Sequence, residues 1–361
     1  MAHDIATSEP SAPINHGGAI DVAARKYGIA AADWLDLSTG INPRAYPVPE
    51  IDLCHWQRLP LRSELDQLKE TAAAYYIAPS PGNLVCTPGT QALIQTIPYW
   101  LRDIGPVGKV HIMGPTYGEH EKCWQRAGHD CEIHLSAPGE RLGTARDILT
   151  AATAGSVVIL VNPNNPDGKL ISPSDILELG KLASDRDCWL IVDEAFIDCT
   201  PDQSACQLID EMPRTIILRS FGKFFGLAGA RLGFAVMASD LAINLEQRIG
   251  PWAVPGPTIS IGVAAFSDTD WQFETLTRLH GEGIRLDAMI ARYTNLSPDG
   301  ATDLFRYYDG TECVSLADHL GKAGILVRLF DQDANKMRFG LPDGDHNWDR
   351  LETALSAWKR G

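Results

Sequence analysis

The chain has 361 residues, of which 45% are hydrophobic and 21% are charged, and its formal net charge is −15. This composition is typical of a globular protein, and the length allows two domains or one large domain with an appendage. The acidic balance argues against a nucleic-acid backbone or an anionic membrane surface as the main partner, although a few focused arginines can still hold an anionic small molecule.

The cysteines and the N-terminus indicate a reducing compartment. None of the eight cysteines forms a Cys-x-x-Cys pair, and the start of the chain lacks the basic residues and the apolar core of a signal peptide. No apolar run approaches the length of a membrane span. We therefore expect a cytoplasmic protein with free thiols, and the sequence gives no reason to expect a metal ion.

Apolar, strand-like runs alternate with helical stretches through the first two thirds of the chain. The runs lie near residues 84–86, 110–113, 157–161, 189–192, 216–218 and 234–237, and helical patterns cover 63–76, 90–101 and 173–184. Nearly continuous apolar strands that alternate with helices predict an α/β fold with a largely parallel sheet covered on both faces. The ligands of such a sheet bind at loops beyond the carboxyl ends of the strands.

A proline-rich break at residues 251–257 predicts the passage to a second domain. A long helical region at 268–294 follows, with short strands near 304–307, 325–329 and 337–339 and a final helix at 347–359. We expect an N-terminal tail and arm near the active site (1–45), a large domain (46–250) and a smaller α+β C-terminal domain (251–361).

One glycine-rich stretch at residues 220–234 carries distinctive chemistry. Lys223 lies among aromatic and small residues, where its charged form is disfavoured, and a neutral lysine attacks aldehydes. Ser220 and Arg231 supply a hydroxyl and a permanently charged guanidinium, which suit a phosphate. An aldehyde that carries a phosphate is pyridoxal 5′-phosphate (PLP). The alternative interpretation is a glycine-rich loop with two solvated cations.

Four other loops after predicted strands carry candidate groups. The segment Gly89-Thr90-Gln91 opens a helix whose free N–H groups would bind an anion, and Tyr117 would lie against a flat ring. The density of Asn and Pro around Asn165 exceeds what a turn requires, and Asp193 is placed to pair with a protonated ring nitrogen. Taken singly, an ordinary turn, a partly buried tyrosine or a helix cap also explains these features.

Together, these residues resemble the fold-type I PLP enzymes, the aspartate aminotransferase superfamily, over nearly the whole chain. Asn165-Pro166-Asp167-Gly168, Val192-Asp193-Glu194-Ala195 and Ser220-x-x-Lys223 with Arg231 stand as they do in that family. The resemblance implies a mainly parallel seven-stranded sheet in a large PLP-binding domain, and it implies a homodimer.

The resemblance also implies a role for each residue. Lys223 and Asp193 would be catalytic, with Lys223 bonded to the cofactor aldehyde and Asp193 paired with the pyridine nitrogen. Asn165 would bind the ring hydroxyl, Tyr117 would stack on the ring, and Ser220, Arg231 and the amides of Gly89, Thr90 and Gln91 would hold the phosphate. Two positions depart from the family, because Phe196 and Leu59-Pro60 stand where many relatives carry a tyrosine.

Three further stretches of sequence narrow the range of possible reactions. His16-Gly17-Gly18, the segment Ser38-Thr39-Gly40-Ile41-Asn42-Pro43 and the residues around Phe196 look like the threonine-phosphate decarboxylases of cobalamin biosynthesis. That family converts O-phospho-L-threonine to (R)-1-amino-2-propanol O-phosphate. The resemblance implies that the phosphorylated amino acid is bound by His16, Gly17, Asn42, Asn165, Arg328 and Arg338.

Several alternatives stay open. A histidinol-phosphate-type aminotransferase would use the same cofactor site, because substrate-positioning groups decide which bond at Cα is broken. A non-catalytic PLP-fold module, such as the sensor half of a transcription regulator, is disfavoured by the acidity of the chain. For both candidate arginines the alternative is a surface salt bridge. Phosphoserine and phosphothreonine differ by one methyl group, worth only about 1–3 kcal/mol, so the sequence does not separate them.

Overall fold

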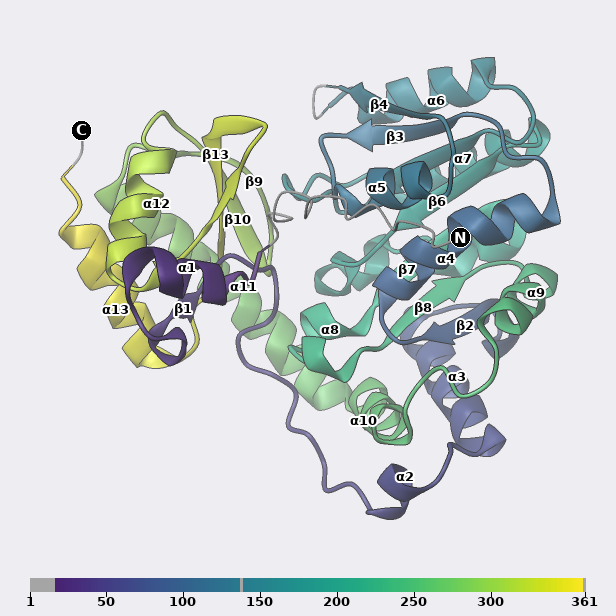
Figure 1. The fold of residues 1–361 in the computed structure, drawn as a ribbon, viewed down its shortest axis with the longest axis horizontal. Helices are drawn as coiled ribbons and strands as arrows, with labels where there is room; N and C mark the ends of the chain where they lie inside the picture. The colour runs from purple at the N-terminus through teal and green to yellow at the C-terminus, as the bar shows by residue number, and fades with distance from the viewer. Residues whose placement is uncertain (1–16, 137–138, 360–361) are drawn as a thin grey trace, which may run out of the picture.

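The computed structural model describes residues 17–136 and 139–359, and its larger part is built on a seven-stranded sheet (Figure 1). The strands follow the order β2-β8-β7-β6-β5-β3-β4. Their bounds are β2 Leu84–Thr87, β3 Val110–Gly114, β4 Cys131–Leu135, β5 Val157–Val161, β6 Trp189–Asp193, β7 Thr215–Ser220 and β8 Gly233–Val236. β8 runs antiparallel to both of its neighbours, whereas the other pairs are parallel. The prediction of a mainly parallel sheet is confirmed.

Helices cover both faces of this sheet, as the sequence predicts. One face packs against α4 (Thr90–Ile104), α5 (Glu119–Arg126) and α9 (Ser239–Ile249). The other packs against α3 (Arg62–Tyr76), α6 (Arg141–Ala151), α7 (Pro173–Asp185) and α10 (Gly256–Ser267). The central strands are apolar on both sides for this reason: along β5, Val157 and Ile159 enter one core, and Val158 and Leu160 enter the other.

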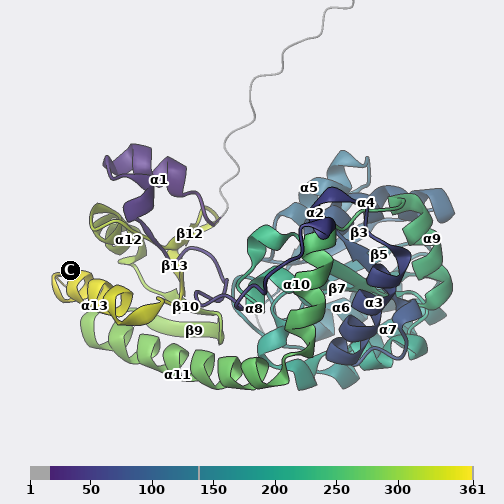
Figure 2. The ribbon, with the colours of Figure 1, turned by 90° about the horizontal axis from the view of Figure 1, so that it is seen from below.

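The smaller part is built on a four-stranded antiparallel sheet of order β12-β13-β10-β9. Its strands are β9 Ser297–Thr302, β10 Phe305–Asp309, β12 Arg328–Phe330 and β13 Asp333–Gly340. The long helix α11 (Thr269–Tyr293) runs from α10 along this sheet, and α12 (Cys313–Lys322) and α13 (Gly344–Ser356) complete the smaller part (Figure 2).

The N-terminal segment joins both parts. β1 (Leu35–Asp36) pairs in parallel with β11 (Ile325–Leu326), and α1 (Ile20–Tyr27) contacts α12. The chain then reaches the larger part, where the backbone N–H of Tyr46 donates to the carbonyl of Phe225. The remaining helices are α2 (Cys54–Gln57), α8 (Phe221–Phe224) and 3-10 turns at Ala31–Asp33, Pro81–Asn83, Ile197–Cys199, Pro201–Gln203, Cys206–Glu211 and Ala228–Ala230.

Two strands of the structure, β4 and β9, are absent from the sequence prediction. β4 lies at the sheet edge and alternates apolar with polar residues, unlike the continuously apolar central strands. β9 contains Pro298, Asp299 and Gly300, which favour turns over strands. The domain boundaries expected at residues 46 and 251 stay predictions. Within the described residues, every helix is too short or too polar to cross a membrane.

Candidate active site

The loops at the carboxyl edge of the large sheet line one pocket. The nine residues that the sequence assigns to cofactor binding all contribute to its wall: Gly89, Thr90, Gln91, Tyr117, Asn165, Asp193, Ser220, Lys223 and Arg231. Most of them follow parallel strands, whose carboxyl ends meet at one edge. Arg231 joins them because it precedes β8, and the reversed direction of β8 brings its start to the same edge.

Lys223 lies on the short helix α8, directly after β7. The pKa of its ammonium group is lowered to about 8, first by burial and then by the positive charges of Arg338 and Arg231, against the opposing charge of Asp193. A lysine with this pKa keeps an appreciable neutral fraction near neutral pH, and the neutral amine is the form that attacks an aldehyde.

Asn42 anchors the turn that carries Lys223. Its backbone N–H donates to the carbonyl of Lys223 over 2.9 Å, and its side-chain amide donates to the carbonyl of Phe224 over 2.8 Å. Nη2 of Arg278 in turn donates to Oδ1 of Asn42 over 2.9 Å. Gly226 permits this contact, because it has a φ of 67° and a Cβ there would lie 2.7 Å from the carbonyl oxygen of Asn42. The structure thus gives Asn42 a supporting position beneath Lys223.

Asp193 ends β6 and is held by two donors. Its Oδ2 lies 2.9 Å from Nε2 of His120, and its Oδ1 accepts from the backbone N–H of Ala195 over 3.0 Å. Both side chains of the His120–Asp193 pair are buried. His120 is absent from the sequence prediction although it contacts Asp193, and the one signal for it there is its position three residues after Tyr117, in the first turn of α5.

A cradle for a phosphate lies at the start of α4. Gly89 has a φ of 86°, and a Cβ there would lie 2.4 Å from Nη2 of Arg231, so glycine lets the guanidinium approach the helix N-terminus. A Cβ on Gly233 would lie 2.3 Å from the backbone N of Thr90. Ser220 pairs with Gly233 across the β7–β8 ladder. The free N–H groups of α4, a hydroxyl and a guanidinium together suit a doubly charged phosphate.

Tyr117 and Gln91 form the side of the pocket next to α5. The phenol of Tyr117 donates to Oε1 of Gln91 over 3.3 Å, and Nε2 of Gln91 donates to Glu119 over 3.1 Å. Burial raises the pKa of Tyr117 to about 12, so its phenol is protonated near neutral pH. A neutral aromatic ring held in this way suits the face of a flat cofactor.

The smaller sheet carries the two predicted arginines, which do not line the pocket themselves, and Arg338 contacts Asn165 in the pocket wall. Nη1 of Arg338 donates to Oδ1 of Asn165 over 2.6 Å, and Nη2 donates to the carbonyl of Ser38 over 3.1 Å. Arg328 lies directly opposite Arg338 in the β12–β13 pair. Burial and the charge of Arg328 lower the pKa of Arg338 to about 10, which leaves it cationic near neutral pH. The two positive charges suit a substrate that carries two anionic groups.

Of the N-terminal residues His16 and Gly17, which the sequence predicts to bind the substrate, only Gly17 can be placed near this arginine pair. A Cβ on Gly17 would lie 2.6 Å from the carbonyl oxygen of Ser38, which is the oxygen that Arg338 binds. Gly17 therefore packs against the segment that the arginine holds. His16 lies outside the described residues.

Phe196 lines the pocket where many relatives carry a tyrosine. Its ring packs edge-on against Phe305, with ring centres 5.2 Å apart, and Nζ of Lys223 lies 5.4 Å from its centre. A Cβ on Gly40 would lie 2.8 Å from the same ring. Phe196 has no hydroxyl, so the amide of Asn165 remains the group that the family resemblance predicts for the cofactor's ring hydroxyl.

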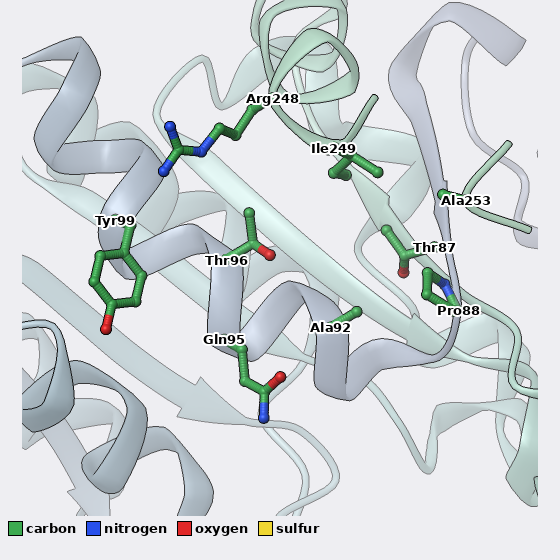
Figure 3. Close-up of a pocket in the computed structure, with 9 residues that line it drawn as sticks. All are labelled: Thr87, Pro88, Ala92, Gln95, Thr96, Tyr99, Arg248, Ile249 and Ala253. Carbon is green, nitrogen blue, oxygen red and sulfur yellow. The ribbon is translucent and has the colours of Figure 1, made fainter. Parts of the chain in front are cut away.

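A second hollow, of about 350 Å³, lies on the other side of the start of α4. It is lined by Thr87, Pro88, Gln95, Thr96, Tyr99 and Arg248 (Figure 3). None of the predicted site residues that the structure describes lines it, and Arg248 is paired with Asp103 at 2.9 Å. The chemistry of the lining residues therefore identifies the pocket of Lys223 as the candidate site.

The residues around Lys223 fit PLP. The pocket offers an amine of lowered pKa for the aldehyde, a helix N-terminus with Arg231 for the phosphate, and a histidine-bound carboxylate for the ring nitrogen. With the seven-stranded sheet, this set defines the class of fold-type I PLP-dependent enzymes. The sequence matches the family Aminotransferase class I and II over residues 57–328, and the chain belongs to that family.

Individual relatives with named activities give a more specific comparison than the family does. Threonine-phosphate decarboxylases from Pseudomonas aeruginosa and a Sinorhizobium species are 39% and 38% identical to this chain, each over 96% of it and 98% of their own length. The crystal structure of histidinol-phosphate aminotransferase from Sinorhizobium meliloti in complex with pyridoxal-5′-phosphate has the same fold, with a TM-score of 0.76. It is 20% identical, and the match covers 98% of each chain.

Proposed function

We propose that this protein is a PLP-dependent threonine-phosphate decarboxylase, with the place in cobalamin biosynthesis that the sequence resemblance implies. It releases CO2 from O-phospho-L-threonine and forms (R)-1-amino-2-propanol O-phosphate. The observation that carries the proposal is the Arg328–Arg338 pair, because Arg338 donates a hydrogen bond to Asn165 and Asn165 lines the pocket of Lys223. The identity of 39% to a threonine-phosphate decarboxylase over 96% of the chain supports it.

PLP is held by the residues gathered at the sheet edge. Lys223 would bond to its aldehyde, the start of α4 with Ser220 and Arg231 would hold its phosphate, and Asp193 would pair with its ring nitrogen. When bound, PLP supplies a sink for the electron pair that is left when a bond at the substrate's Cα breaks. His120 keeps the carboxylate of Asp193 in place, through their contact of 2.9 Å.

Arg328 and Arg338 orient the substrate. Phosphothreonine carries a phosphate and a carboxylate, and bidentate guanidinium contacts fix the orientation of such groups as well as binding them. By fixing these two groups, the arginines would determine which bond at Cα is placed for cleavage and would favour loss of the carboxylate over loss of the Cα proton. While the substrate's amino group takes its place on the aldehyde, the free amine of Lys223 would be suited to deliver the proton that replaces CO2 at Cα.

A histidinol-phosphate-type aminotransferase is the second candidate, and a non-catalytic PLP-fold module is the third. The experiment that separates them incubates the holoprotein with phosphothreonine, with and without an added 2-oxo acid. A decarboxylase releases CO2 in both reactions. An aminotransferase needs the 2-oxo acid and releases none, and a non-catalytic module consumes no substrate in either reaction.

The family resemblance also supports a homodimer in the cytoplasm. Light scattering of the purified holoprotein tests the assembly, because the chain mass is 39.4 kDa. We expect a particle of twice that mass. A particle with the mass of one chain at working concentrations would contradict this part of the proposal.

A further inference from the structure

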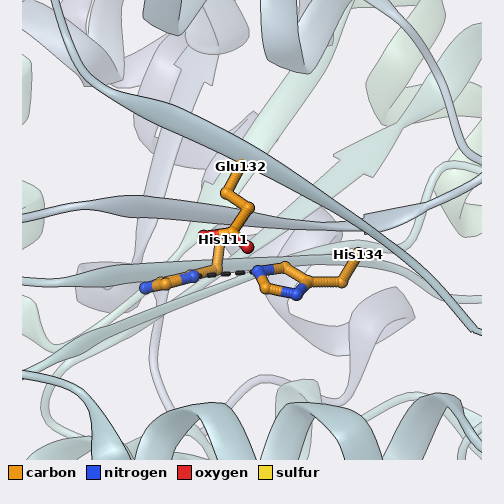
Figure 4. Close-up of side chains that lie close together, drawn as sticks. All are labelled: His111, Glu132 and His134. Carbon is orange, nitrogen blue, oxygen red and sulfur yellow. Dashed lines mark hydrogen bonds between the residues drawn. The ribbon is translucent and has the colours of Figure 1, made fainter.

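Two histidines and a glutamate meet on the outermost parallel strands of the large sheet. The β3–β4 register pairs His111 with Glu132 and Met113 with His134, so all of these side chains leave the same face of the pair. Figure 4 shows the two imidazoles end to end, with the Glu132 carboxylate next to His111. No metal ion is predicted from the sequence, in which His111 and Glu132 are far apart, and the two residues meet only through strand pairing.

The ligand atoms of the three residues are close together. Nδ1 of His111 and Nε2 of His134 are 2.9 Å apart, and their ring centres are 5.1 Å apart, so the two nitrogens face each other. One ring nitrogen of each histidine and a carboxylate oxygen of Glu132 all lie within 4.8 Å of one another. The imidazoles are half-buried and Glu132 is exposed, so an ion can reach the group from solvent.

We propose that His111, Glu132 and His134 bind a divalent transition-metal ion at the open edge of the sheet. Imidazole nitrogens suit Ni²⁺, Cu²⁺ and Zn²⁺, and a carboxylate completes a set of three ligands. With metal–nitrogen bonds of roughly 2.0–2.1 Å, nitrogens 2.9 Å apart subtend an angle of about 90° at the ion. That angle belongs to square-planar or octahedral coordination, with water in the remaining positions, and both imidazoles have to turn so that their lone pairs point at the ion instead of at each other.

The charged groups around the three residues allow an ion to replace their present contacts. Nζ of Lys109 lies 2.7 Å from Glu132 and 4.0 Å from Asp130, and all three side chains are exposed. An ion has to displace Lys109, and exposed ion pairs are weak. The imidazole that donates in the His111–His134 bond must also move its proton to its other ring nitrogen.

This site lies apart from the proposed decarboxylase site, because none of its three residues lines the pocket of Lys223. A bound ion would link β3 to the edge strand β4. Because an ion that binds only the folded chain stabilises it, metal binding should raise the melting temperature of the protein.

A calorimetric titration with Ni²⁺ tests the proposal on holoprotein freed of metal by a chelator. Ni²⁺ is the probe because thiolates favour other ions and the chain has eight cysteines. His134→Ala and Glu132→Gln should each weaken binding at this site by at least about tenfold, since even the outer partners of metal ligands contribute that much. Lys109→Met removes the competing cation and should tighten binding about two- to fivefold.

His280→Ala is the matched control, because His280 is an exposed histidine on α11 outside the cluster, and we expect it to bind Ni²⁺ as the wild type does. Glu132→Gln and Lys109→Met change exposed side chains, so they test the site even if His134→Ala fails to fold. The wild type should also melt at a higher temperature with Ni²⁺, and Glu132→Gln should show a smaller rise. The proposal is overturned if the holoprotein binds no Ni²⁺, or if Glu132→Gln and Lys109→Met both bind it like the wild type.

Discussion

Nη1 of Arg338 donates a hydrogen bond to Oδ1 of Asn165 over 2.6 Å, and this bond ties β13 of the smaller sheet to the loop after β5 of the larger one. Asn165 lines the pocket of Lys223, and Arg338 lies opposite Arg328. The bond therefore joins the residues proposed to hold the cofactor to those proposed to hold the substrate, and it fixes the orientation of one relative to the other.

Replacing either arginine by lysine tests this relationship. Arg338→Lys and Arg328→Lys keep the charge but lose the fork, so we expect each to lower kcat/KM for decarboxylation at least about tenfold, or about 1.4 kcal/mol of transition-state binding. Looser positioning should also let the Cα–H bond take the cleavable position more often. The measurement is CO2 release together with the accumulation of pyridoxamine phosphate.

Arg62→Lys serves as the control for these variants, because Arg62 is exposed on α3 and pairs with Asp66. It should decarboxylate like the wild type. If Arg338→Lys and Arg328→Lys also keep the wild-type rate and the wild-type product ratio, the two arginines are structural.

Lys223→Ala should abolish both colour and activity. Without the amine, the protein loses the visible absorption band of lysine-bound PLP and nearly all turnover. Lys322→Ala, at an exposed lysine on α12, is the control and should keep the band. An absorption spectrum and a CO2 assay on both variants suffice, and full activity of Lys223→Ala would refute its assignment.

The His120–Asp193 contact predicts a graded effect on turnover. Hydrogen bonds to charged groups contribute about 1.5–3 kcal/mol, so His120→Leu should lower kcat roughly ten- to hundredfold. His120→Gln can still offer an amide to the carboxylate and should recover part of the loss. Asp193→Ala should lower the rate of the chemical step by several orders of magnitude while some PLP still binds. Single-turnover rates measure this series, and a fully active His120→Leu or Asp193→Ala variant would rule out the proposed role.

The lowered pKa of Lys223 predicts a pH dependence for cofactor uptake. With a pKa of about 8, the neutral amine makes up about a tenth of the population at about pH 7 and most of it above about pH 9. The rate at which apoprotein takes up PLP should therefore rise through this range and then level off. Because the charge of Arg338 lowers this pKa, Arg338→Met should move the midpoint to higher pH. Stopped-flow absorbance follows uptake, and a flat profile would contradict the assignment.

The central part of the fold can be predicted from the sequence because the central strands have a recognisable sequence pattern. Strands such as β5 are buried on both faces and therefore read as continuous apolar runs. The edge strand β4 is half-exposed, and β9 owes its strand pairing to β10 despite its turn-like residues. Those two strands depend on tertiary contacts that local sequence does not display.

The candidate site likewise contains residues that can be identified from the sequence and residues that cannot. Lys223, Asp193 and Arg231 stand in short motifs next to strands, so the sequence identifies them. His120 carries no such motif, and only the packing of α5 against the sheet brings it to Asp193. Asn42 is expected among substrate-binding residues by resemblance, yet its hydrogen bonds to the turn of Lys223 become visible only in the folded chain.

The most direct measurement of the central claim is the mass of the product formed from phosphothreonine in D2O. Decarboxylation replaces the carboxylate with one proton from solvent and leaves the original Cα–H bond intact. We predict one equivalent of CO2 and 1-amino-2-propanol O-phosphate that carries one deuterium on the carbon next to nitrogen. A keto acid product without CO2, or unchanged phosphothreonine, would contradict the assignment of this protein as a decarboxylase.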